Sequence, residues 1–160
     1  MKSLAVISNS AAQTKRLGSR LGELAAPGDV ILLVGKLGAG KTCFTQGMAK
    51  GLGIDEYTAS PSFVLVREYQ GRLPLYHIDL YRLDRLEEVV HLGLDDYLYG
   101  KGVSVVEWAD RGLSVLPVEH LLIKIEHLAT TKRKLTFEPK GARYTKMLAT
   151  LRTARKSVRK

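Results

Sequence analysis

The stretch Gly35-Lys36-Leu37-Gly38-Ala39-Gly40-Lys41-Thr42 fits the pattern G-x-x-x-x-G-K-[ST], in which a glycine-rich loop wraps around phosphate groups. Its glycines permit backbone conformations that a Cβ atom would block, so the loop amides can point at phosphate oxygens. Lys41 is placed to reach the β- and γ-phosphates, and the hydroxyl of Thr42 is a ligand for Mg²⁺. The stretch therefore predicts a P-loop that binds a nucleoside triphosphate with Mg²⁺.

The residues on either side of this loop supply the context that the motif requires, a strand before it and a helix after it. Residues 30–34 form a continuous apolar run, which is typical of a buried strand. A helix is predicted over residues 42–52, because Phe44 and Met48 repeat on one helical face and Gly53 stands where a helix ends. The alternative is a glycine-rich turn between strand and helix that binds nothing, and the full motif in this context disfavours it.

The rest of the chain alternates between strand and helix patterns. Further strands are predicted over residues 4–7, 63–69, 73–80, 103–106, 119–128 and 134–137. Further helices are predicted from a cap within residues 8–10 to the turn at residues 27–29, from an Asp84 cap to Gly93, and from 144 onward. The composition of residues 70–72 predicts a hairpin turn, and residues 94–100 are predicted to be a connection. We predict an α/β, P-loop NTPase-like three-layer fold with a mixed, mainly parallel central sheet flanked by helices.

Two carboxylates follow apolar runs and are candidates for the metal site that a P-loop needs. Asp79 ends the run at residues 75–78, and Glu107 ends the run at residues 103–106. Both are expected at the carboxyl edge of the sheet, where ligands of open α/β sheets bind. The alternative is that both are ordinary exposed acids at strand ends. The neighbouring P-loop favours the metal site over this alternative. His77 is expected to pack in the sheet or to hydrogen-bond a neighbour.

The length of 160 residues predicts one domain. The sequence has a single cysteine and no apolar run long enough to span a membrane, so a cytoplasmic location is expected. Its net charge of +9 is unevenly placed. Residues 132–160 hold eleven Lys/Arg and one acid, whereas residues 1–131 hold fourteen Lys/Arg and fifteen acids. We therefore divide the chain into a domain over 1–140 and a basic helix or tail over 141–160, for which contact with a polyanion such as tRNA is one interpretation and solubility the other.

Several pieces of the sequence together resemble the TsaE (also called YjeE) family, P-loop ATPases of bacterial tRNA threonylcarbamoyladenosine biosynthesis. The matching pieces, which span roughly residues 8–139, are Gly35 to Thr42, Ser60-Pro61-Ser62-Phe63, residues 76–83 (Tyr-His-Ile-Asp-Leu-Tyr-Arg-Leu), Gly93-Leu94 with Asp96-Tyr97, and Val106-Glu107-Trp108. The P-loop is shared by many NTPases, whereas the last pieces are far more selective. The resemblance implies an Mg²⁺-dependent ATPase, weak alone, that acts with TsaD-type and TsaB-type partners.

The resemblance also implies roles for individual residues. Those matching Lys41, Asp79, Glu107 and Trp108 are needed for activity, and Thr42, Glu107 and Asp79 are the expected metal-site residues. The expected nucleotide contacts are Gly35, Gly38, Ala39, Gly40, Lys41, Thr42, Cys43, Ser60, Ser62 and Arg133. On chemistry alone, Trp108 would be a core residue and the segment of Ser60 and Ser62 a plain turn. At three positions this chain differs from the usual family residue: Lys36 replaces Asp, Cys43 replaces Thr and Ser62 replaces Thr. Ser62 keeps a hydroxyl, whereas Cys43 does not, so any role of a hydroxyl at position 43 does not carry over to this chain.

Two other functions use the same features. A small-molecule kinase also has a P-loop, and Arg82, Arg85 and Arg111 are candidates for closing over phosphates, although no segment looks like a dedicated lid. A nucleic-acid-binding module would use the basic tail, with nucleotide binding secondary. A GTP-specific switch is disfavoured because the sequence contains no N-K-x-D string.

Overall fold

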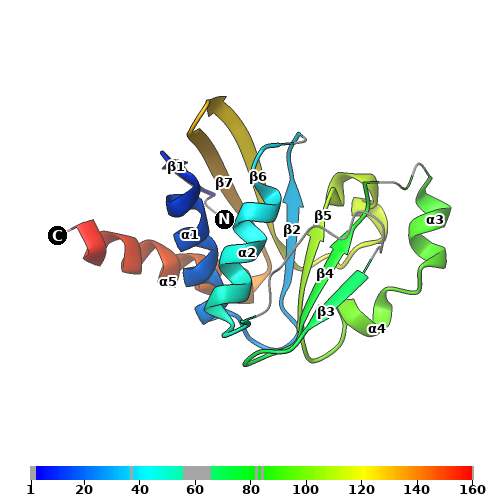
Figure 1. Cartoon of the computed structure of the whole chain (residues 1–160). Coiled ribbons are helices and arrows are strands. Elements are labelled where there is room, and N and C mark those ends of the chain that lie inside the picture. Colours follow the sequence, from blue (N-terminus) through cyan, green and yellow to red (C-terminus); the bar gives the residue numbers. More distant parts are fainter. Residues whose placement is uncertain (1–2, 37, 56–65, 82, 84, 160) are drawn as a thin grey trace.

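The structure, a computed structural model, describes residues 3–36, 38–55, 66–81, 83 and 85–159, with side chains up to residue 153 in the last helix. The strands are β1 (Leu4–Ser8), β2 (Val30–Val34), β3 (Val66–Tyr69), β4 (Leu75–Asp79), β5 (Val103–Glu107), β6 (His120–Ala129) and β7 (Lys132–Lys140). The helices are α1 (Ala11–Leu24), α2 (Lys41–Gly51), α3 (Leu86–His91), α4 (Asp95–Leu98) and α5 (Ala142–Arg159), with 3₁₀ turns η1 (Ala109–Arg111) and η2 (Leu113–Val115). Figure 1 shows their arrangement.

The described strands join one sheet of seven strands in the order β1-β7-β6-β2-β5-β4-β3. The central strands β6, β2, β5 and β4 run parallel, whereas the pairs β6–β7, β7–β1 and β4–β3 are antiparallel. Helices α1, α2 and α5 pack on one face, and α3, α4 and the 3₁₀ turns on the other (Figure 1). The predicted three-layer α/β fold with a mixed sheet is confirmed. Strand β2 is buried on both faces, which explains its unbroken apolar run.

Helices α1 and α2 approach each other through glycines on both sides of their contact. A Cβ atom added at Gly47 would lie 2.1 Å from the carbonyl oxygen of Lys15, and one at Gly51 would lie 2.1 Å from that of Ser19. Gly18 and Gly22 of α1 face α2 in the same way. Each helix therefore carries two glycines four residues apart, which lie on one face and let the two backbones touch. The P-loop helix is thus fixed against its neighbour by backbone contact.

The first half of α5 belongs to the core. Tyr144, Met147, Leu148 and Leu151 are buried with the side chains of α1 and α2. The Tyr144 hydroxyl accepts a hydrogen bond from the amide of Val30 at 2.8 Å, which ties α5 to the first residue of β2. Burial raises the pKa of the Tyr144 hydroxyl. The division of the chain at residue 140 stays a prediction.

Arg143 adds an ion pair beneath this contact. Its guanidinium donates to both carboxylate oxygens of Asp29, at 3.1 and 2.8 Å, and to the carbonyl of Leu24 at 2.8 Å. Asp29 is buried and also accepts from the amide of Ala26, so the turn between α1 and β2 is closed by one carboxylate. The hydrogen bond to Asp29 is the main cause of the raised pKa of Arg143.

Several predicted boundaries differ from the structure. The predicted connection over residues 94–100 contains the one-turn helix α4, because Leu94 and Leu98 are buried against the sheet. Helix α3 begins at Leu86 with Arg85 at its N-cap and without a side-chain cap among the described residues, and Asp84, the predicted cap, lies outside them. The strand predicted over 63–69 is described only from Val66 onward as β3.

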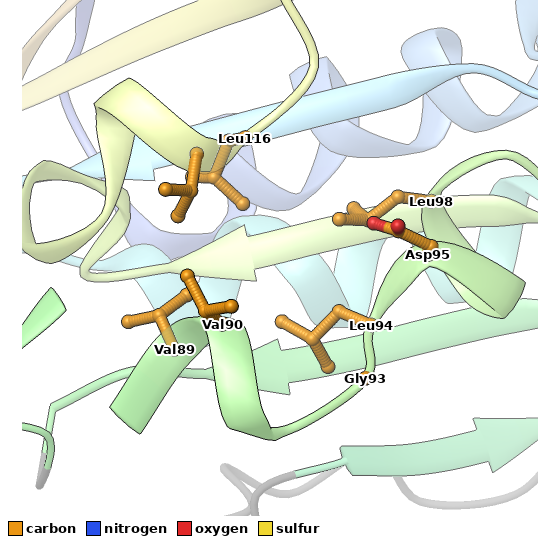
Figure 2. Close-up of a pocket in the computed structure, with 8 residues that line it drawn as sticks. Val89, Val90, Gly93, Leu94, Asp95, Leu98 and Leu116 are labelled. Carbon is orange, nitrogen blue, oxygen red and sulfur yellow. The ribbon is translucent and has the colours of Figure 1, made fainter. Parts of the chain in front are cut away.

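An apolar pocket of about 200 Å³ lies on the α3 and α4 face of the sheet, away from α2. Figure 2 shows Val89 and Val90 of α3, Leu94, and Leu116 after η2 around it, with Asp95 at one side. Val90 is 58% exposed and its neighbour Leu86 is 41% exposed, so apolar surface continues beyond the pocket. Within the described residues, no helix combines the length and apolar character needed to cross a membrane.

We predict that Gly47→Ala lowers the free energy of unfolding by about 1–3 kcal/mol, because the new methyl group must push the backbones of α1 and α2 apart. Urea denaturation followed by circular dichroism measures this change. Lys50→Ala, at an exposed position of the same helix, is the matched control and should shift stability by no more than about 0.5 kcal/mol. Equal stability of Gly47→Ala and wild type would contradict the backbone contact.

Candidate nucleotide-binding site

The P-loop lies between β2 and α2 and has the backbone that its glycines predict. Gly38 and Gly40 have φ angles of +80° and +111°, a region that favours glycine. A Cβ atom at Gly35 would lie 2.6 Å from the carbonyl oxygen of Ile125 in β6, so the loop passes close to that strand. Among the described residues no side chain caps α2 at Gly40, which leaves the first amides of this helix available to an anion.

Lys41 is buried at the first position of α2. Its Nζ donates to the carbonyl oxygens of Gly35 and Lys36, at 2.5 and 3.0 Å, and lies 3.9 Å from the centre of the Trp108 ring. Burial lowers the pKa of Lys41, and the carboxylates of Glu107, Asp79 and Asp110 partly oppose this effect. The loop thus holds a cation that its own carbonyls and one aromatic face stabilise.

The two predicted acids lie side by side at the carboxyl edge of the sheet. Asp79 of β4 and Glu107 of β5 are direct partners in the parallel register and are 5% and 2% exposed. The Thr42 hydroxyl donates to Oε1 of Glu107 at 3.4 Å, and Oδ1 of Asp79 accepts from the amide of Tyr81 at 2.8 Å. The structure therefore brings Thr42, Glu107 and Asp79 together and excludes the alternative of exposed strand-end acids.

His77 is more closely involved than sequence reasoning indicated. It is fully buried in β4, and its Nε2 makes a very short contact with Oε2 of Glu107. Both side chains point to the face of the sheet that carries α1 and α2, since Leu75 and Val105 in the same alternation belong to that core. The sequence contained one signal for this placement. His77 lies two residues before Asp79, and residues i and i+2 of a strand share a face.

Trp108 follows Glu107 directly and turns the chain out of the sheet. Its φ of +58° makes it the one non-glycine residue with positive φ among the described residues. The ring packs on Tyr81 with centroids 4.8 Å apart, and the Arg111 guanidinium lies 5.9 Å from the Trp108 ring. A large side chain in this backbone region is strained, and such strain is often found at functional sites. Trp108 therefore packs at the edge of the core, as its size predicts, and also faces Lys41 of the P-loop.

Arg133 of β7 reaches the P-loop from the opposite side. Its Nε donates to the carbonyl of Ala39 at 2.9 Å, and one Nη lies 3.5 Å from that of Gly38. A hollow of about 210 Å³ adjoins this contact, and its walls include Arg133, Gly40 and Cys43. Burial raises the pKa of the Cys43 thiol, which donates to the carbonyl of Ala11 at 3.5 Å.

The remaining predicted residues are placed as follows. Lys36 is exposed and lines a separate hollow of about 360 Å³ with Lys124 and His127 of β6. Ser60 and Ser62, two of the expected nucleotide contacts, lie outside the described residues. The site thus joins β2, β4, β5, α2 and β7 around one loop.

Comparisons with known proteins show the family of the chain. The sequence profile of the family described as threonylcarbamoyl adenosine biosynthesis protein TsaE matches residues 8–135. The chain belongs to the TsaE family. A relative from Treponema pallidum (strain Nichols), named tRNA threonylcarbamoyladenosine biosynthesis protein TsaE, is 46% identical over 130 residues, which are 81% of this chain and 96% of the relative. A Bacillus subtilis (strain 168) protein of the same name is 47% identical over 133 residues, 82% and 83% of the two chains.

A solved structure extends the likeness to nearly the whole chain. The crystal structure of Bacillus subtilis YdiB superposes with a TM-score of 0.84 at 39% identity and covers 96% of each chain. The likeness therefore includes most of α5, which lies beyond the residues that the TsaE family profile matches.

Trp108 should report on the P-loop, because it is the only tryptophan and Lys41 lies against its ring. We predict that saturating ATP changes its fluorescence emission as Lys41 turns from the ring and the loop carbonyls toward phosphate. Lys41→Met should lose this response, whereas Lys50→Met, at the exposed far end of α2, should keep it. Unchanged emission at a nucleotide concentration where calorimetry shows binding would contradict the proposed movement.

Proposed function

We propose that the protein is the ATP-binding and ATP-hydrolysing member of an assembly that forms threonylcarbamoyladenosine in tRNA, acting with TsaD-type and TsaB-type partners in the cytoplasm. The observation that carries this proposal is the convergence of Lys41, Thr42 and Glu107 around a P-loop. Membership of the TsaE family supports the biological role. The P-loop geometry supports phosphate binding independently of that membership.

The loop fits a triphosphate in its charge and its hydrogen-bond donors. Lys41 donates to two loop carbonyls, and phosphate oxygens would be better partners for an ammonium group than neutral carbonyls. The uncapped start of α2 supplies further amide donors and the positive end of a helix dipole. The hollow beside Arg133 and Cys43 is open for the nucleoside end of the same ligand.

The donor set also fits Mg²⁺. No three His, Cys, Asp or Glu side chains gather as a metal site within the described residues, so protein side chains alone would not enclose the ion. Mg²⁺ prefers few carboxylates and keeps waters and phosphate oxygens in an octahedral shell, and Thr42 with Glu107 provides such a partial set. Bound there, Mg²⁺ would neutralise charge on the phosphates during transfer. Asp79, next to Glu107, would hold water that the ion or the reaction uses.

The kinase alternative gains no support from the arginines proposed for it. Arg111 donates to the carbonyl of Leu83 and lies over the Tyr81 ring, so it stabilises the chain near Trp108. Arg85 is 80% exposed in its side chain beside Glu88, and Arg82 lies outside the described residues. We therefore retain hydrolysis, with water as the acceptor, as the proposed reaction.

We predict that Lys41→Ala and Thr42→Ala each lower phosphate release from Mg²⁺-ATP by about 100-fold or more, because each removes a group aimed at the reacting phosphates. Release should be slow for the isolated chain and faster with TsaD-type and TsaB-type proteins present. A malachite-green assay with and without these partners measures both effects, with Thr150→Ala on the exposed side of α5 as control. Normal release by either P-loop variant, or fast partner-independent transfer to a metabolite, would refute the proposal.

The basic end of α5 is proposed to contact tRNA phosphates. The last described buried side chain is Leu151, and residues 154–160 add four Lys/Arg and no acid. In Figure 1 this end of α5 extends away from the sheet. A deletion of residues 141–160 would remove core side chains such as Tyr144. A shorter truncation is therefore needed to separate the effect of the positive charge on tRNA binding from a loss of stability.

We predict that ending the chain at Thr153 weakens tRNA binding at low salt and flattens its salt dependence, each lost phosphate contact lowering the logarithmic slope by about 0.7–0.9. Fluorescence anisotropy with labelled tRNA at several salt concentrations measures the slope. ATP affinity, measured in parallel, should not change because the P-loop and both acids lie upstream. Identical slopes for the two chain lengths would leave the solubility interpretation of the tail.

A further inference from the structure

His77 and Glu107 form a buried pair across two parallel strands. In the register of β4 and β5, Asp79 lies opposite Glu107, which makes His77 the diagonal neighbour of Glu107 on the same face. The imidazole is fully buried and contacts Oε2 of Glu107 through Nε2. The other oxygen of this carboxylate, Oε1, faces the hydroxyl of Thr42. The two oxygens of Glu107 therefore have different partners.

The surroundings of the second imidazole nitrogen, Nδ1, indicate which tautomer of His77 fits this contact. Nδ1 of His77 is buried and finds no hydrogen-bond partner among the described residues. A proton on Nδ1 would leave a buried donor unpaired and would turn the lone pair of Nε2 toward a carboxylate oxygen. A neutral ring with its proton on Nε2 donates to Glu107 and leaves only an acceptor unpaired. His77 thus acts as a one-sided donor aimed at Oε2.

The neighbouring carboxylate shows why such a donor matters. Asp79 and Glu107 are direct cross-strand partners, and like charges in this position repel. Asp79 is held by the amide of Tyr81, so it is Glu107 whose carboxylate needs a fixed partner. Without His77, Oε2 would be buried without its donor, and the carboxylate would be free to rotate away from Asp79 and from Thr42.

We propose that His77 is a positioning residue that occupies Oε2 of Glu107 and presents Oε1 alone, next to the Thr42 hydroxyl, to the Mg²⁺ of the bound nucleotide. This inference rests on the function proposed above and adds a residue that does not touch phosphate. Groups that orient a metal ligand from behind set the affinity of the metal, and their loss lowers that affinity by about 10–100-fold. His77 is predicted to act on Mg²⁺ binding and not on the P-loop's grip on phosphate.

The test compares His77→Leu, which removes the donor, with His77→Gln, whose side-chain amide can place an N–H near the position of Nε2. Binding of a fluorescent ADP analogue is titrated without divalent ions and then against increasing Mg²⁺, so that nucleotide and metal affinities are separated. His120→Leu is the matched control. His120 is also a buried histidine, but it is the first residue of β6, at the strand end away from the P-loop, and its ring is hydrogen-bonded to the carbonyl of Pro117. Thermal unfolding of all variants identifies loss of fold.

We expect His77→Leu to raise the Mg²⁺ concentration at the binding midpoint about 10-fold or more, with little change in nucleotide affinity without Mg²⁺. His77→Gln should have a midpoint close to that of the wild type. His120→Leu should have the wild-type midpoint. An unchanged midpoint in folded His77→Leu would overturn the inference, as would equal losses with and without Mg²⁺ in both His77 variants. Wild-type protein that binds the ADP analogue neither with nor without Mg²⁺ would instead overturn the proposed function itself.

Discussion

The parallel register of β2, β5 and β4 is the constraint on which the rest of the site depends. It brings the end of β2, where the P-loop begins, beside Glu107 and Asp79 at the ends of the next two strands. Parallel strands end at the same edge, so groups far apart in the chain meet there. The glycine contact of α1 with α2 then holds the P-loop helix at that edge. A shift of one residue in β5 would turn Glu107 to the other face.

The site stores buried charge, which is costly unless the charges stabilise one another. Lys41, Asp79 and Glu107 are the buried ionisable groups that lie at this edge of the sheet, and the buried imidazole of His77 contacts Glu107. Each has a fixed polar contact, from loop carbonyls for Lys41 to the Tyr81 amide for Asp79. Such fixed groups do little for stability, and apart from Lys41, which would have to turn toward phosphate, they would need little rearrangement if an anionic ligand bound. The left-handed backbone of Trp108 belongs to the same local strain.

Charge is also divided between the two faces of the sheet. Residues 86–100, which form α3 and α4, contain four acids and no Lys or Arg, whereas residues 142–160 contain seven Lys/Arg and no acid. The first half of α5 is nevertheless structural, since Tyr144 bonds to β2 and Arg143 closes the turn at Asp29. One helix therefore completes the core and carries the excess positive charge away from it.

The sequence alone determined the P-loop, its strand and helix, the sheet edge where Asp79 and Glu107 lie, and the family, because these depend on spacing within short segments. Only the tertiary structure decided that Gly18, Gly22, Gly47 and Gly51 meet, or that Arg133 reaches Ala39 from 94 residues away. His77 became a partner of Glu107 through a strand register that no local pattern specifies. Periodicity fixes which face a side chain occupies, whereas its partner depends on how distant strands and helices align.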